Sequence, residues 1–152
     1  GRVVECRRAG FWRNKNGAIS ADAVIFFDIG IAHELFMRCK CSGHIPFKRR
    51  FLAALLRAYI ADGLWLRNAL RATDAACALA FRLQAVEGVT IAHPVQVNMV
   101  FADMSPKVIG SLKIAGFEFF VHEGRRRFVT SFATTPVSVD AVVGTAQRVA
   151  RP

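Results

Sequence analysis

The chain has 152 residues, of which 53% are apolar and 11% aromatic, so it can bury a hydrophobic core and is not intrinsically disordered. No apolar run approaches the roughly 20 residues that cross a bilayer, so the sequence predicts no membrane partner. The formal charge of +10 raises the possibility of nucleic-acid binding. However, the basic residues are scattered and no nucleic-acid-binding motif accompanies them. We therefore predict no nucleic-acid partner and keep a basic nucleic-acid-binding module as the less favoured alternative.

A polar turn, "NKNG", precedes the first clear strand. The apolar run at 23–28 predicts a short buried strand. Asn14 and Asn16 tolerate left-handed backbone, and Gly17 permits a tight bend. A lysine that forms a Schiff base needs a low-dielectric pocket and a rigid backbone, and a turn leading into a buried strand can supply both for Lys15. Composition alone favours the simpler interpretation, in which Lys15 is a solvent-facing turn residue.

Helices dominate the next part of the chain. A helical segment is expected at 31–40, followed by a loop that contains Gly43 and Pro46. Gly63 separates two longer helices, which begin near Lys48 and at Leu64. The first has apolar residues on one face, namely Leu52, Leu55, Leu56, Tyr59 and Ile60. The second is expected to run to Val86 with an inner stripe of Leu66, Ala69, Leu70, Thr73, Cys77, Ala80 and Phe81. This first half offers only one obvious strand.

From Val89 the pattern changes to strand, strand, helix, strand, strand, helix. Strands are expected at 89–92, 95–104, 117–122 and 127–132, the last two joined by the turn "EGRRR". Ser105 followed by Pro106 predicts a helix start, Gly116 a helix end, and Thr135-Pro136 the start of the last helix. The predicted fold class is therefore α/β, with an α+β C-terminal subdomain that packs helices on one face of a small sheet.

The sequence also contains a candidate metal motif, "CKCSGH". Zinc favours Cys-x2-Cys pairs with a second ligand pair, whereas Cys39 and Cys41 are one residue apart and only His44 follows. We predict no metal and interpret the thiols as buried or half-buried at a helix end. The chain has four cysteines (Cys6, Cys39, Cys41 and Cys77) and no visible export signal, which indicates reduced thiols and a cytoplasmic location.

The remaining candidates are histidines and one arginine. His33, His93 and His122 have no nucleophile or carboxylate at a telling spacing, so we interpret them as packing or surface residues. Arginine runs usually form solvated turns. Because Arg127 opens a predicted strand, its side chain can point inward while Arg125 and Arg126 point outward.

Several ordered segments together resemble one family. "NKNGAISADAVIFFD" resembles the "TKNG…AEAVVFFD" segment of low-specificity L-threonine aldolases, and "GHIPFKRRFLAALLRAYIADGLWLRNA" is similar to "GHLxSKxRFLAA…DGxWLxNA". Further on, "HPVQVNMVFADM" is similar to "PVEANxVF", "AGFEFF" to "AGWRFY", and "RRFVTSFATT" to "xRFxxSWxT". The similarity extends from about Lys15 to Val149.

The resemblance implies an enzyme of the fold type I pyridoxal-phosphate class. Residues 1–62 would be the tail of its large cofactor-binding domain, and residues 63–152 its small C-terminal domain. The implied reaction is a retro-aldol cleavage of L-threonine or related β-hydroxy-α-amino acids to glycine and an aldehyde, with pyridoxal 5'-phosphate as cofactor. A homotetramer is typical of the family.

The resemblance also implies roles for individual residues. Lys15 corresponds to the lysine that forms the Schiff base with the cofactor. Asn14 stands where the family has threonine, and its amide can still donate a hydrogen bond near the cofactor. Lys48 and Arg50 match a basic loop near the cofactor phosphate or a subunit interface. Arg127 corresponds to the arginine that binds the substrate α-carboxylate.

Some family features precede the matched segment and are not among these residues: a phosphate-binding Gly-Thr loop, a ring-stacking histidine and an aspartate at the pyridinium nitrogen. We therefore expect an incomplete, C-terminal part of the enzyme that is inactive by itself. The alternative is a non-catalytic, truncated remnant of the family. Reading the DNA upstream of Gly1 distinguishes the two, because an open frame with a glycine-rich loop favours the enzyme.

Overall fold

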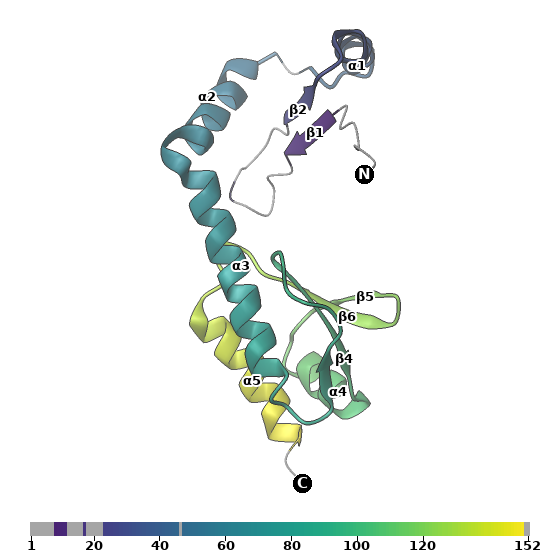
Figure 1. Ribbon diagram of the computed structural model, residues 1–152, viewed down its shortest axis with the longest axis vertical. Helices are drawn as coiled ribbons and strands as arrows, with labels where there is room; N and C mark the ends of the chain where they lie inside the picture. The colour runs from purple at the N-terminus through teal and green to yellow at the C-terminus, as the bar shows by residue number, and fades with distance from the viewer. Residues whose placement is uncertain (1–7, 12–16, 18–22, 46, 151–152) are drawn as a thin grey trace, which may run out of the picture. The chain divides into compact units, whose positions relative to one another are not determined.

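The structure, a computed structural model, describes residues 8–11, 17, 23–45 and 47–150 (Figure 1). The chain divides into two compact units, Gly1–Trp65 and Leu66–Pro152, and each is described here by itself. Both contain helices and antiparallel strands. In the described part of the chain, every helix is too short or too polar to span a bilayer.

The first unit begins with a strand pair. Strand β1 (Arg8–Phe11) pairs antiparallel with β2 (Ala23–Phe26), with Arg8 opposite Phe26. The expectation of a single strand in this half is therefore wrong, because a charged segment without an apolar pattern supplies the second one. Helix α1 (Ile29–Cys41) follows directly, and the Asp28 carboxylate accepts a hydrogen bond from the Gly30 backbone N–H at 2.8 Å. That carboxylate is an ordinary N-cap and explains where the helix begins.

Helix α2 (Arg49–Ile60) continues through a short 3-10 turn, η1 (Ala61–Gly63). The break predicted at Gly63 is confirmed, since Asp62 and Gly63 both have positive φ angles. The face predicted for α2 is only partly buried: Tyr59 is buried, whereas Leu55 and Ile60 are exposed. Helical spacing thus identified the helix but not the extent of its burial.

The second unit has the element order that the sequence predicted. Helix α3 (Leu64–Leu83) is followed by β3 (Val89–Ile91), β4 (Met99–Met104), α4 (Pro106–Ile114), β5 (Phe120–His122), β6 (Arg125–Val129) and α5 (Pro136–Ala150). The sheet is antiparallel with strand order β3-β4-β6-β5. Ser105 accepts from the Val108 N–H as the expected N-cap of α4. Capping and turn residues were sufficient to predict the order of the elements in this unit because each signal is local.

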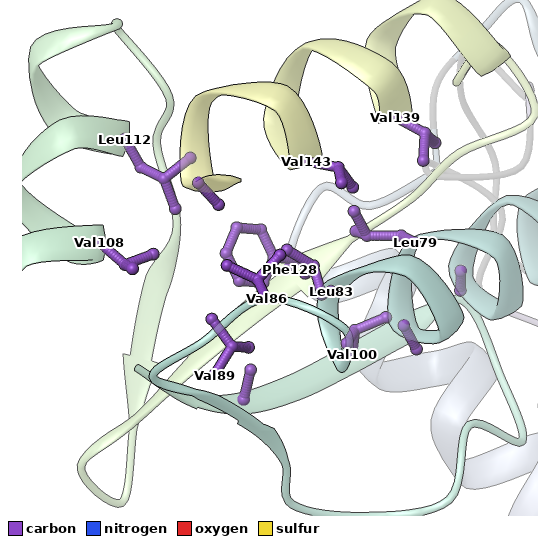
Figure 2. Close-up of a cluster of buried hydrophobic side chains, with 14 residues drawn as sticks. Leu79, Leu83, Val86, Val89, Val100, Val108, Leu112, Phe128, Val139 and Val143 are labelled. Carbon is purple, nitrogen blue, oxygen red and sulfur yellow. The ribbon is translucent and has the colours of Figure 1, made fainter. Parts of the chain in front are cut away.

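The core lies between one face of this sheet and helices α3, α4 and α5 (Figure 2). Val100 on β4 and Phe128 on β6 lie opposite each other and point toward the helices. Leu83, Leu112 and Val143 reach them from α3, α4 and α5 respectively. Because side chains alternate along a strand, Phe101 and Arg127 lie on the opposite face of the sheet, called the open face below.

Helix α3 packs through a different face from the predicted one. Its buried residues are Asn68, Ala72, Ala76, Leu79, Ala80 and Leu83. Of the predicted stripe only Ala80 is buried, whereas Leu66, Leu70, Cys77 and Phe81 are exposed. The helix carries two apolar faces, and the one rich in alanine meets the core.

The hairpin between β5 and β6 is tighter than expected. His122 pairs with Arg125, so the turn consists only of Glu123 and Gly124, which have φ angles of 50° and 81°. Two consecutive positive φ angles are typical of the turn that suits a two-residue hairpin. The arginines at 125–127 are therefore strand residues, and the predicted five-residue turn is wrong.

Candidate functional site

The candidate site lies on the open face, around Arg127. In the strand register Arg127 is directly opposite Phe101 on β4 and Phe120 on β5, so these three residues form one row across the sheet. The Arg127 Cζ lies 5.0 Å from the centroid of the Phe120 ring. This distance is within the range in which a guanidinium is attracted to an aromatic face. The expectation that Arg127 points inward while Arg125 and Arg126 point outward is wrong, because strand alternation puts Arg125 and Arg127 together on the open face and Arg126 on the face of Phe128.

The charge on Arg127 has no acidic partner among the described residues, and no oxygen acceptor there takes a hydrogen bond from it. Its Nε is shielded from solvent without a hydrogen-bond acceptor. The adjacent row differs, because the Arg125 Nε lies 3.5 Å from the Asp103 carboxylate. Arg126 donates to the Gly124 carbonyl at 3.1 Å. Of the three consecutive arginines, Arg127 is the one for which no described residue provides an oxygen partner.

Two histidines complete the surroundings of the row. The His93 ring contacts Phe101 edge-on at 5.8 Å between centroids, and the His122 ring lies 5.9 Å from the same phenylalanine. The interpretation of His93 and His122 as packing residues is confirmed. His33 lies exposed on α1. Among the described residues, none of these histidines has a hydrogen bond to a nucleophile or a carboxylate.

The basic residues predicted near a phosphate lie at the start of α2, in the first unit. Lys48 is the N-cap residue of that helix, and its side chain makes no capping hydrogen bond. Arg50 is exposed, and its Cζ lies 5.4 Å from the Phe51 ring centroid. The first turn contains no acidic residue. The structure thus brings Lys48 and Arg50 together at one helix end.

Lys15 and Asn14 lie outside the described residues, so their predicted roles stay predictions. Gly17, two positions later, is described and has a φ of 95°. That angle confirms the expected tight bend, which glycine adopts readily and other residues rarely do.

The "CKCSGH" motif forms the end of α1. Cys39 is half-buried, as expected, but Cys41 is exposed, and both thiols are free. Within the described ranges, no three His, Cys, Asp or Glu residues cluster so as to hold a metal ion. Gly43, with a φ of 71°, ends the helix, so this segment has a structural explanation.

Sequence reasoning missed Phe101 and Phe120 as site residues because both lay within apolar strands. The signal that finds them is the strand register, which depends on the length of the hairpin turn. Once Glu123 and Gly124 are recognised as the complete turn, Phe120 must lie opposite Arg127.

Comparison with known proteins agrees with the resemblance found in the sequence. The chain is 34% identical over 131 residues to the low specificity L-threonine aldolase of Pseudomonas sp. (strain NCIMB 10558), which covers 85% of this chain and 38% of that protein. It is 37% identical over 126 residues to the low specificity L-threonine aldolase of Pseudomonas aeruginosa (strain PAO1). That match covers 82% of this chain and 36% of the aldolase. No family model matches the chain.

These similarities place the chain among the relatives of pseudomonad low specificity L-threonine aldolases, and the predicted family resemblance is confirmed. The chain spans little more than a third of the length of these curated relatives.

Proposed function

We propose that this chain is part of a pyridoxal-phosphate-dependent lyase that cleaves L-threonine or related β-hydroxy-α-amino acids to glycine and an aldehyde. The observation that carries the proposal is the similarity to two enzymes of that name over more than four-fifths of the chain. The unpaired guanidinium of Arg127 on the open face supports it, because an amino-acid substrate needs a cationic site for its carboxylate.

Arg127 would bind the substrate α-carboxylate through its two terminal nitrogens. The Nε is shielded, so a carboxylate meets the guanidinium end-on rather than from the side. Two parallel hydrogen bonds fix the orientation of the carboxylate as well as its position. Holding the carboxylate in this way fixes which bond at the substrate Cα is aligned to break, and such alignment accounts for a large part of catalysis.

The described residues at the start of α2 fit a phosphate group. Lys48, Arg49 and Arg50 provide three cationic side chains, and the first backbone N–H groups of a helix favour an anion. We propose that Lys48 and Arg50 contact the phosphate of pyridoxal phosphate, that Asn14 donates a hydrogen bond near it, and that Lys15 supplies the amine that holds its aldehyde. When bound, the cofactor supplies an electron sink for the electron pair left at the substrate Cα.

The larger assembly is proposed on the same basis. Residues 1–62 would belong to a cofactor-binding domain and residues 63–152 to a small domain of a fold type I enzyme. A homotetramer in the cytoplasm, with no nucleic-acid or membrane partner, is the arrangement that the resemblance favours. We expect the 152-residue chain alone not to cleave threonine, because the contacts to the cofactor ring that the resemblance implies lie before the matched segment.

Reductive trapping tests the cofactor proposal. Incubation of the chain with pyridoxal phosphate, followed by borohydride reduction, should label Lys15 in preference to the other lysines. Peptide mass mapping reads the label, and Lys15→Arg should abolish it at that peptide. The control Lys40→Arg, which changes an exposed lysine on α1, should leave the label unchanged. Equal labelling of all lysines would contradict a cofactor role for Lys15.

A parallel assay tests the expected inactivity of the isolated chain. Threonine cleavage by the isolated chain, abolished by Lys15→Ala, would show that the expected inactivity is wrong and would eliminate the non-catalytic remnant.

A gel shift at low salt should show no retardation of nucleic acid, and a salt-dependent shift would instead favour the basic binding module.

A further inference from the structure

Three consecutive arginines on β6 are held in three different ways. Arg125 lies beside the Asp103 carboxylate at 3.5 Å, and Arg126 donates to the Gly124 carbonyl at 3.1 Å. Arg127 instead lies over the face of Phe120, with 5.0 Å between its Cζ and the ring centroid. Oxygen acceptors therefore hold the first two arginines, whereas an aromatic ring holds the third.

This difference has a chemical consequence for Arg127. The charge of an arginine beside a carboxylate is already paired, so an incoming anion must compete with that carboxylate. An aromatic ring orients the guanidinium plane without accepting a hydrogen bond from its edge. The Nε atoms of all three arginines are shielded without an acceptor, so the difference lies in the other partners: Arg125 has a carboxylate, Arg126 a carbonyl and Arg127 an aromatic ring.

We propose that Phe120 is a positioning residue for carboxylate binding by Arg127. The ring orders the guanidinium before the ligand arrives and leaves its two terminal nitrogens free for end-on binding. Ordering the side chain in advance reduces the entropy lost on binding. The inference rests on the proposed function, because the carboxylate is the α-carboxylate of the amino-acid substrate.

Phe101 closes the row on the other side of Arg127. It lies opposite Arg127 in the β4–β6 register, and the His93 and His122 rings pack around it. Phe120, by contrast, is 63% exposed on the edge strand β5. Truncating Phe120 should therefore change the contact with Arg127 while leaving the buried core intact.

The test follows the Nε–Hε signal of Arg127 by NMR in the full chain, assigned by its loss in Arg127→Lys. Sodium acetate is the carboxylate probe, and sodium chloride at the same ionic strength controls for screening. In Phe120→Leu we expect the ring-current shift of Hε to disappear, its heteronuclear NOE to fall, and the acetate dissociation constant to rise about two- to five-fold. Phe120→Tyr keeps the ring and should restore all three values.

Val121→Ala is the matched control. Val121 on β5 is as exposed as Phe120, but it lies opposite Arg126 and not Arg127. This variant should leave the Arg127 signal and its acetate affinity unchanged. The amide signals of Val100 and Phe128 report in every variant that the core remains folded.

The possible results separate this inference from the proposed function. If the Arg127 signal and acetate affinity are the same in Phe120→Leu as in the parent chain, the positioning role is wrong. If Phe120 orders Arg127 but acetate has no more effect than chloride, the carboxylate role in the proposed function is wrong, whereas the aromatic ordering stands.

Discussion

The two units differ in how much of their apolar sequence they bury. In the second unit, fourteen residues form one buried cluster between the sheet and three helices. In the first unit, Tyr59 is the only apolar side chain that is buried among those described. Helix α1 buries none of its residues, although it has a good N-cap and a glycine at its end. Signals for forming a helix are therefore separate from signals for burying one.

Helix α3 shows the same separation within one element. Its alanine-rich face packs in the core, and the face with Leu66, Leu70 and Phe81 is exposed. Periodicity identifies both faces as apolar and cannot rank them, because the choice depends on the elements that pack against the helix. The predictions below test this contrast between packed and unpacked apolar residues.

The largest expected effect is at Leu83, which is fully buried in the second unit. Leu83→Ala should reduce the free energy of unfolding by about 2–5 kcal/mol, because it leaves a cavity in the core. Leu55→Ala, on the exposed side of α2, should change it by less than about 0.5 kcal/mol. Urea unfolding monitored by hydrogen exchange measures both. Equal losses would contradict the difference between the units.

A smaller effect is expected at Thr130, whose buried hydroxyl donates to the Ala72 carbonyl of α3 at 2.6 Å. Thr130→Val keeps the shape but removes the donor, and should reduce stability by about 1–2 kcal/mol. Thr90→Val changes an exposed residue of β3 and should be close to neutral. The same denaturation experiment would contradict the role of Thr130 if the two variants were equally stable.

The smallest change in the free energy of unfolding is expected for substitutions of the helix caps. Their effects on helix content should nevertheless differ clearly between the two units. Ser105→Ala should cost about 1 kcal/mol and leave α4 helical, because Val108 and Leu112 anchor it in the core. Asp28→Ala should reduce the helix population of α1 itself, which has no buried side chain to hold it. Carbon chemical shifts measure helix content residue by residue. An α1 that stays fully helical without its cap would show that packing, and not the cap, maintains it.

The sequence predicted the second unit well and the first less well. Ser105-Pro106 and Gly116 marked α4 correctly because these signals act within one turn of helix. Strand β1 was missed, since its residues Arg8–Phe11 have no apolar alternation. The buried face of α3 was missed for the same general reason, namely that it depends on contacts distant in sequence.

The sequence placed Arg127 in a strand and Lys48 and Arg50 near the start of a helix, as the structure has them, and the roles of these residues stay predictions. The predicted direction of the Arg127 side chain was wrong, because alternation along β6 puts it on the open face beside Arg125. Lys15 and Asn14 lie outside the described residues. The partners of Arg127 were not predicted, because no pattern in a single strand reveals what lies opposite it across a sheet.

The two-residue turn at Glu123 and Gly124 fixes the register of β6 and so determines which of its side chains lie on the open face. Because side chains alternate, shifting the strand by one residue exchanges its two faces. Suppose that one residue is inserted in this turn and that β6 shifts by one position to accommodate it. Arg127 would then point toward the helices and Phe128 toward solvent. The length of the turn, more than the identity of any residue in it, therefore determines whether the open face of the sheet carries the Arg127 guanidinium or the Phe128 ring.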